Sequence, residues 1–184
     1  MKHKIFFNIS ILMIFTLVVL GCAEEESTEP NEDNLLYETS FENNGSFSTD
    51  GWSLSVSSRS SNSTPPGGGS YSLEITATDP PETYSSVKVA AKSQYTINRL
   101  TFWSKGSGVA SGVYGKAILS VIRNGAQLRS KSILVDRIDW STFSIQDTFA
   151  VAAGDSFLIQ LSGGMNQLLS GKSYFDLVQL QGIK

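Results

Sequence analysis

From residue 35 to the C-terminus, hydrophobic and polar residues alternate in short runs, with a period of two that is typical of β-strands. Two runs near the C-terminus, 157–161 and 175–180, show it most clearly, and both are rich in residues that favour strands. Similar runs occupy 54–57, 73–76, 87–89 and 117–121. No convincing helical periodicity follows Leu20. The chain from residue 35 onward is therefore predicted to be all-β.

Turn-forming residues separate the predicted strands. Glycine, proline, asparagine and aspartate gather in the breaks, where a proline removes no hydrogen bond from a sheet. Asn124 and Gly125, between two alternating runs, predict a β-hairpin with a type I′ turn. About ten strands separated by such turns predict a sandwich of two antiparallel sheets. The Ser- and Gly-rich segment 57–70 is predicted to be a loop inside this domain, since strands on both sides are needed to complete a core.

A basic and apolar leader precedes the domain. Lys2 and Lys4 come before an apolar stretch, 5–20, that is short for a membrane span and typical of a signal peptide. The stretch runs through Val-Leu-Gly into Cys22, which resembles the lipobox of bacterial lipoproteins. The resemblance implies that residues 1–21 are removed and that the Cys22 thiol carries a lipid, with acyl chains such as palmitate. The alternative is an ordinary signal peptide, or an uncleaved anchor, with an incidental cysteine.

An acidic segment links the leader to the domain. Residues 23–34 are nearly free of apolar side chains, so we expect a disordered tether. An acidic run after the lipid-bearing cysteine resembles the surface-export signal of Bacteroidota lipoproteins. The absence of aspartate directly after Cys22 fits sorting to the outer membrane of a Gram-negative bacterium. A solvated spacer without a sorting role is the alternative. The chain thus divides into a signal peptide (1–21), a lipidated cysteine with its tether (22–34) and a folded domain (35–184).

The only cysteine and the only histidine, Cys22 and His3, lie before the domain. Their absence from the domain excludes Ser-His-Asp and Cys-His catalysis, disulfides, zinc sites, haem and iron–sulfur clusters. The remaining plausible chemistry is a carboxylate pair acting on a glycoside, and the domain's few acids show no recognised motif for it. We therefore expect a protein that is not an enzyme. The domain has 12 basic and 11 acidic residues without a basic stripe, which argues against nucleic acid as a partner.

Five short patterns follow one another across the domain, at 38–52, 69–75, 100–106, 140–143 and 173–180. They are an opening Phe-Glu before Gly-Trp, a Ser-Tyr-Ser-Leu strand, a Phe-Trp-Ser-Lys-Gly strand, a Trp-x-x-Phe strand and a closing Tyr-Phe-Asp-Leu-Val strand. In order and spacing they resemble the galactose-binding-like jelly-roll carbohydrate-binding modules that are appended to xylanases and cellulases. The resemblance covers nearly the whole domain. It implies a jelly-roll β-sandwich, and it favours a carbohydrate ligand.

The same resemblance implies a structural calcium ion where the first and last strands of the domain lie side by side. The positions that match its ligands are Glu42 and Asp176. Calcium takes about six to eight oxygen ligands, and carboxylates supply most of the affinity. The closing pattern departs from the family at Leu177, where a second acid is common. The alternative is that Glu42 and Asp176 are solvated acids at strand ends, or that each pairs with a nearby lysine.

Sugar recognition in such modules uses exposed aromatic rings that stack on pyranose faces. In the strand 100–104, alternation places Phe102 and Trp103 on opposite faces, so Trp103 is predicted to face outward if Phe102 lies in the core. Its charge-poor, Ser-rich surroundings favour a neutral ligand. The alternative is that the other sheet or a loop covers Trp103. Weaker candidates for the same site are Tyr114, Tyr84 and Arg123.

The other two tryptophans, Trp52 and Trp140, match positions that are core positions in the family, and both are predicted to be structural. We expect a monomeric lipoprotein, anchored by lipid in the outer membrane and exposed at the cell surface. It would present one non-catalytic carbohydrate-binding module to a polysaccharide or glycan. The alternative function is a structural or adhesion module whose partner is a protein or a cell-envelope component.

Overall fold

The computed structural model of the chain describes residues 35–77, 82–108, 112–163 and 171–184. The predicted signal peptide, Cys22 and the acidic tether lie outside these residues. Within them, no helix is long and apolar enough to cross a membrane. The strands are β1 (Leu35–Thr39), β2 (Glu42–Asn43), β3 (Ser46–Phe47), β4 (Trp52–Ser53), β5 (Ser58–Ser61), β6 (Ser72–Thr76), β7 (Ser85–Ala90), β8 (Ile97–Ser107), β9 (Gly115–Arg123), β10 (Ala126–Val135), β11 (Ser141–Asp147), β12 (Ser156–Gly163) and β13 (Lys172–Ile183).

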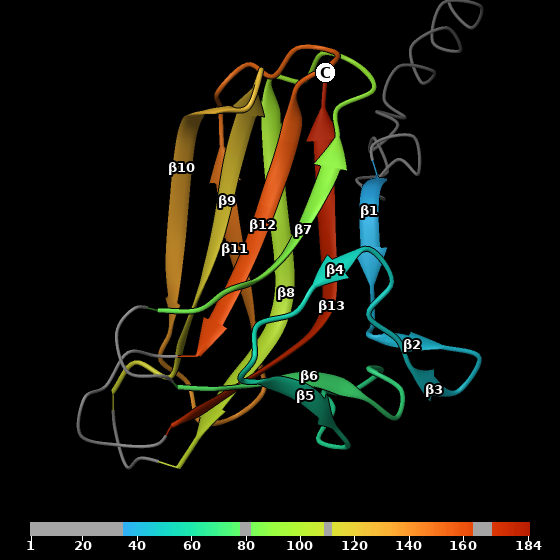
Figure 1. Ribbon diagram of the computed structural model, residues 1–184, viewed down its shortest axis with the longest axis vertical. Helices are drawn as coiled ribbons and strands as arrows, with labels where there is room; N and C mark the ends of the chain where they lie inside the picture. Colours follow the sequence, from blue (N-terminus) through green and yellow to red (C-terminus); the bar gives the residue numbers. More distant parts are fainter. Residues whose placement is uncertain (1–34, 78–81, 109–111, 164–170) are drawn as a thin grey trace, which may run out of the picture. The chain divides into compact units, whose positions relative to one another are not determined.

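Two large sheets form the domain, and Figure 1 shows them as two layers. The first sheet has the strand order β11-β8-β13-β6-β5, with β1 also paired to β13. The second sheet has the order β10-β9-β12-β7-β4, and β2 and β3 form a separate short ribbon. The neighbours in each sheet run antiparallel. The predicted all-β jelly-roll sandwich of two antiparallel sheets is confirmed.

The core lies between the sheets because side chains alternate along each strand. In β8 every second residue is buried, so Leu100 and Phe102 point inward whereas Trp103 is partly exposed on the outer face. Phe102 stacks on Phe143 of β11, with ring centroids 5.6 Å apart, and contacts Phe175 of β13 at 5.9 Å. Burial of each such ring contributes about 1.5–3 kcal/mol. This cluster therefore fixes which face of the first sheet is inward.

The predicted hairpin between two alternating runs is confirmed, and it joins β9 to β10. Its two central residues both have positive φ angles, 51° at Asn124 and 81° at Gly125. A type I′ turn requires this conformation, and its twist matches that of the flanking strands.

The segment 57–70 is a loop only in part, which corrects the sequence prediction. Within it, β5 pairs with β6 and forms the edge of the first sheet. Its four residues are Ser, Arg, Ser and Ser, and each of them remains partly or fully exposed. An edge strand of this kind needs no alternation of apolar residues, so hydrophobic patterning could not detect it.

Strand β13 changes its partner on one side partway along its length, from β6 to β1. On the side away from β8, its residues 172–175 pair with β6, and its residues 178–181 pair with β1. Between them the register with β8 shifts, and Leu177 has a left-handed backbone with φ 46°. A bulge of this type redirects the neighbouring side chain. Here it leaves Asp176 fully buried instead of outward-facing.

Candidate functional site

A row of aromatic and charged side chains crosses the outer face of the first sheet. The partners Lys105 and Tyr174 lie opposite each other on β8 and β13, and Tyr174 is also opposite Glu74 on β6. Glu74 in turn lies opposite Arg59 on β5. Trp140 extends the row at the other end, because it directly precedes Ser141, whose partner is Ser104 beside Lys105. We call these five residues, Trp140, Lys105, Tyr174, Glu74 and Arg59, the cross-strand row.

Lys105 is held between two aromatic rings of this row. Its Nζ atom lies 5.1 Å from the ring centroid of Tyr174 and 5.4 Å from that of Trp140. The two rings meet edge to face, with centroids 6.4 Å apart and an interplanar angle of 62°. An ammonium within about 6 Å of an aromatic face gains about 0.5–1 kcal/mol at an exposed site. The three side chains therefore orient one another.

Trp103 lines a pocket together with Trp140, the end residue of the cross-strand row. The pocket has a volume of about 750 Å³ and lies between the start of β11 and the segment before it on one side, and β8 on the other. Both indoles are partly exposed. The prediction that Trp140 is a core residue is therefore wrong, whereas the outward position predicted for Trp103 is confirmed. Polar lining side chains are Asp136, Arg137, Asp139, Ser141 and Thr142.

Trp52, by contrast, is a core residue as predicted, with 9% of its surface exposed. Its indole Nε1 donates a hydrogen bond to the Tyr37 hydroxyl at 2.6 Å. Its ring packs on Phe41 with centroids 5.4 Å apart. The three tryptophans of the domain thus divide into one buried indole and two that share a surface pocket.

Tyr114 belongs to the same pocket as Trp103, but it is almost entirely buried. Only 1% of its surface is exposed. Its ring lies against Gly106, where a Cβ atom would come within 1.8 Å of the ring. The Tyr114 carbonyl also accepts a hydrogen bond from the hydroxyl of Ser173. Tyr114 therefore forms part of the pocket wall and has little surface to offer a ligand.

The other two candidates, Tyr84 and Arg123, lie on the second sheet, away from Trp103. Tyr84 directly precedes β7, and its hydroxyl donates to Glu82. Burial, together with that carboxylate, raises the pKa of Tyr84 to about 12. Arg123 ends β9 and binds both oxygens of Asp155, at 2.8 and 2.7 Å. These bonds, with a further one from a backbone N–H, lower the pKa of Asp155 to about 2.

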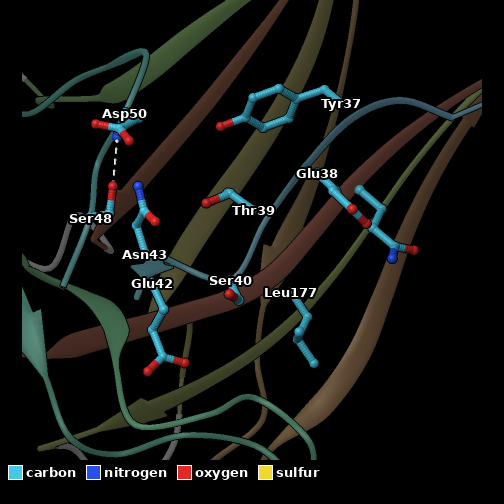
Figure 2. A pocket seen from close by; sticks show the side chains of 10 residues that line it. Tyr37, Glu38, Thr39, Ser40, Glu42, Asn43, Ser48, Asp50 and Leu177 are labelled. Carbon is cyan, nitrogen blue, oxygen red and sulfur yellow. Dashed lines mark hydrogen bonds between the residues drawn. The ribbon is translucent and has the colours of Figure 1, made fainter. Parts of the chain in front are cut away.

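Glu42, one of the two predicted calcium ligands, lines a second pocket, of about 560 Å³, between β1 and the β2–β3 ribbon. Figure 2 shows the carboxylate of Asp50 at the top of this pocket, level with the Tyr37 hydroxyl, and the carboxylate of Glu42 at the bottom, with the Thr39 hydroxyl at a height between them. The Asp50 N–H donates to Ser48 Oγ at 3.4 Å. The pocket wall is therefore polar and rich in oxygen atoms.

Asp176 lies close to this pocket and is fully buried. Its Oδ1 accepts a hydrogen bond from the Leu177 N–H at 2.7 Å, and its Oδ2 has no hydrogen-bond partner. Burial, and to a smaller extent the negative charge of Glu42, raise the pKa of Asp176 to about 7, although the bond from Leu177 opposes the change. An orphaned carboxylate oxygen of this kind is costly without a cation or a proton.

Glu42 and Asp176 meet beneath two adjacent glycines. A Cβ atom at Gly69 would lie 1.6 Å from Glu42 Oε2, and one at Gly68 would lie 2.4 Å from Asp176 Oδ2. Glu42 Oε1 also accepts a hydrogen bond from the Ser70 N–H at 2.9 Å. The structure thus brings the two predicted ligand residues together and shows that only glycine fits over them.

The donor set fits calcium. The carboxylates of Glu42 and Asp176, the second with an orphaned oxygen, suit a hard cation that takes oxygen ligands. The residues beside them, Phe41 and Leu177, have left-handed φ angles of 55° and 46°. Such strain, about 1–2 kcal/mol per residue, tends to persist at ligand sites. Within the described ranges no three Asp, Glu, His or Cys side chains form a metal cluster, so further ligands would be carbonyl oxygens or water.

Comparisons with known proteins agree with this fold. No protein-family model matches the sequence, and no curated protein matches it. Among solved structures, the CBM22-1 xylan-binding domain from Paenibacillus barcinonensis Xyn10C is similar, with 19% identity and a TM-score of 0.55, covering 82% of this chain and 96% of that one. The CBM22-1-GH10 modules of Clostridium thermocellum endo-1,4-β-D-xylanase 10B, complexed with xylohexaose, match with 13% identity and a TM-score of 0.51 over 82% and 29% of the chains.

A phage protein shares the same architecture. The enzymatically active domain of bacteriophage CBA120 tailspike protein 4 matches with 15% identity and a TM-score of 0.54, covering 73% of this chain and 20% of that one. At such identities the likeness concerns the fold. The domain is thus a jelly-roll β-sandwich of the kind that occurs in carbohydrate-binding modules.

Proposed function

We propose that the domain binds carbohydrate without turning it over, and that the ligand lies in the pocket of Trp103 and Trp140. One observation carries this proposal: two partly exposed indoles from neighbouring segments of one sheet line a single surface pocket. Stacking on an aromatic face supplies most of the affinity of a sugar ring, and a few polar groups select its hydroxyls. Asp139, Arg137 and Thr142 are the lining side chains suited to that second role.

Within the described strands, the outer face of the second sheet offers no comparable stacking surface, which supports the choice of the Trp103–Trp140 pocket. Its outward positions carry aliphatic, serine, glutamine and lysine side chains, and no described strand of that sheet directs an aromatic ring outward. The aromatic rings Trp103, Trp140 and Tyr174 all belong to the outer face of the first sheet and its margin. A stacking site is therefore better supported on the first sheet.

Binding without catalysis is proposed because the pocket lacks a suitable pair of acids. A glycosidase needs two carboxylates, one of them kept as a general acid by a raised pKa. Asp136 lies beside Arg137, 3.6 Å from its Nε atom, and is largely exposed. No other lining residue except Asp139 is acidic. The CBM22-1 domain, which shares the fold over 96% of its own length, is a xylan-binding domain.

We also propose that the domain is displayed at the cell surface of a Gram-negative bacterium by a lipid on Cys22. The support comes from the leader, where the single cysteine follows a short apolar stretch and precedes an acidic run. A lipid anchor with a polar tether would leave the Trp103–Trp140 pocket free to meet extracellular polysaccharide.

Calcium has a structural role in this proposal. Glu42 and Asp176 would hold the ion, which would neutralise two carboxylates that otherwise repel each other beneath Gly68 and Gly69. The ion would join β2 to β13 and so stabilise one end of the sandwich. The calcium position is separate from the proposed sugar pocket, since the two pockets share no lining residue.

A glycan array with the purified domain tests the proposal. We expect the wild type to bind at least one polysaccharide, and we expect Trp103→Ala and Trp140→Ala each to weaken binding at least about tenfold, or about 1.4 kcal/mol. Tyr84→Phe, on the other sheet, is the matched control and should bind as the wild type does. Melting temperatures of all variants show whether folding is intact. If both tryptophan variants bind as tightly as the wild type, the proposed site is contradicted. If the wild type binds no glycan on the array, the proposed function is contradicted.

A further inference from the structure

We propose that the sugar-binding face of the first sheet prefers glycans that carry an anionic group, which the ammonium of Lys105 binds. The anionic group is a carboxylate or a sulfate ester. This inference rests on the proposed function, because it names the ligand class of the same site. It departs from the neutral ligand that the sequence around Trp103 favours.

The charge of Lys105 is exposed to ligand and is not neutralised by the protein. Among the described residues it forms no ion pair. Its contacts are the faces of Tyr174 and Trp140, at 5.1 and 5.4 Å from the ring centroids. Aromatic faces position an ammonium, but they leave its positive charge and its three N–H donors available to an anion. Lys105 is therefore a prepositioned cation beside the indole on which a sugar would stack.

Arg59 of the cross-strand row and Lys172, which binds the row's Glu74, add positive charge. Glu74 is the single carboxylate there, with 7% of its side chain exposed, and two cations already bind it. The Arg59 Nε atom donates to Glu74 Oε1 at 2.6 Å, and Lys172 Nζ lies 3.1 Å from the same oxygen. Burial opposes ionisation of Glu74, but these bonds hold its pKa below the usual value. One carboxylate thus meets two cations, which leaves an excess positive charge beside Tyr174.

The pocket's own charges do not cancel this excess. Asp136 and Arg137 lie 3.6 Å apart and offset each other, and Asp139 is the remaining acid. Counting the row, Lys172 and the pocket together, there are four cations, Arg59, Lys105, Lys172 and Arg137, against the three acids Glu74, Asp136 and Asp139. Asp139 lines the pocket, whereas Lys105, Lys172 and Arg59 lie outside its lining, on β8, β13 and β5. An anionic substituent is therefore favoured on the side of Lys105.

The arrangement fits a sugar that stacks on an indole and points its charged group along the row. The Lys105 ammonium lies over the Trp140 ring, 5.4 Å from its centroid, so a sugar in the pocket of Trp103 and Trp140 would have this charge beside it, available to the exocyclic carboxylate of a uronic acid or to a sulfate ester. A neutral sugar would gain the same stacking but no contact with the charge. Lys105 is thus a specificity-determining residue, and the tryptophans are the affinity-determining ones.

The experiment measures binding of the full domain to matched polymers that differ only in charge. The first pair is polygalacturonate and its carboxyl-reduced form, and the second is a sulfated galactan and its desulfated form. The proteins are the wild type, Lys105→Gln, Lys105→Arg and the control Lys88→Gln, which removes an exposed lysine from the outer face of the second sheet. Melting temperatures confirm that each variant is folded.

We expect the wild type to bind the charged member of at least one pair about fivefold more tightly at low salt. A preference in the first pair identifies a carboxylate, and one in the second identifies a sulfate ester. Lys105→Gln should abolish the preference but keep binding to the neutral polymer, whereas Lys105→Arg and Lys88→Gln should retain the preference. Salt at about 0.5 M should reduce it, because exposed charges are then screened.

Two results would overturn the inference in different ways. Equal binding to both members of each pair, or a preference that persists in Lys105→Gln, removes the role of Lys105 and leaves carbohydrate binding intact. No binding to any of the four polymers, with a blank glycan array, removes the inference together with the proposed function. The first outcome concerns the ligand class alone, and the second concerns the site itself.

Discussion

The substitution Asp176→Asn separates the cost of a buried carboxylate from the benefit of a bound ion. Asp176 is fully buried, Oδ2 has no partner, and its pKa is about 7 compared with 3.8 for an ordinary aspartate. A group whose pKa is raised on folding binds more protons in the folded state than in the unfolded one. Without calcium, stability should therefore be highest at about pH 4 and fall as the pH rises to about 7.

The magnitude follows from the pKa. Ionised Asp176 lowers the stability of the calcium-free domain by about 4 kcal/mol above pH 7, from a pKa of about 7 instead of 3.8. Asparagine keeps an oxygen for the Leu177 N–H and carries no charge. In chelator at pH 8, Asp176→Asn should thus melt on the order of 10 °C higher than the wild type. At pH 4 the two proteins should melt at nearly the same temperature.

Calcium should narrow this difference, because the gain from the ion is smaller than the cost of the buried charge. An ion bound only to the folded state at about a hundred times its dissociation constant adds about 2.7 kcal/mol to the wild type. Asp176→Asn loses that gain, and Glu42→Gln should lose it as well. Asp147→Asn is the control: this buried carboxylate binds Arg129 at 2.9 Å, so its loss should destabilise the domain equally with and without calcium.

The assay is thermal unfolding at pH 4 to 8, in chelator and in calcium, for the wild type and the three variants. The reasoning fails if Asp176→Asn melts below the wild type in chelator at pH 8. It also fails in its second part if calcium leaves the wild-type melting curve unchanged. The two results are independent, since the first tests the buried charge and the second tests the ion.

Three further predictions concern the anchor, the second sheet and the core. Cys22→Ala should release the protein from the membrane fraction without changing its melting temperature, and retention there would identify an uncleaved apolar anchor. The free energy of unfolding should fall as the pH drops from about 4 to 2, because the folded pKa of Asp155 is about 2. Urea unfolding of Arg123→Gln should show a smaller fall over the same pH range. A fall as large as that of the wild type would contradict the pairing of Arg123 with Asp155. Phe102→Ala should cost about 3–5 kcal/mol of unfolding free energy, and Trp103→Ala clearly less.

The sequence predicted the fold because alternation survives in the long strands. In β8, inward Phe102 and outward Trp103 occupy the positions that a period of two assigns to them. The same argument applied to β11 predicts an outward Trp140, since Phe143 and Ile145 are inward and Trp140 is an odd number of residues from both. Comparison with family core positions pointed the other way, and strand parity would have been the better guide.

Hydrophobic patterning along the sequence does not predict which residues of different strands lie side by side. Arg59 and Lys172 are far from Lys105 along the chain, and only the pairing of β5, β6, β13 and β8 puts them on one face. For the same reason Tyr84 and Arg123 looked like companions of Trp103, but strand order places them on the other sheet. The meeting of Glu42 with Asp176 came from the resemblance to a family and not from spacing.

Indole resonances give the most direct test of where sugar binds. The chain has three tryptophans, and each indole N–H gives its own signal in an ¹⁵N-correlated NMR spectrum. On titration with an oligosaccharide of the polymer that binds, the signals of Trp103 and Trp140 should shift together with one affinity. The signal of Trp52, buried and hydrogen-bonded to Tyr37, should stay in place as an internal control. Saturating binding that leaves the Trp103 and Trp140 signals unmoved would contradict the account.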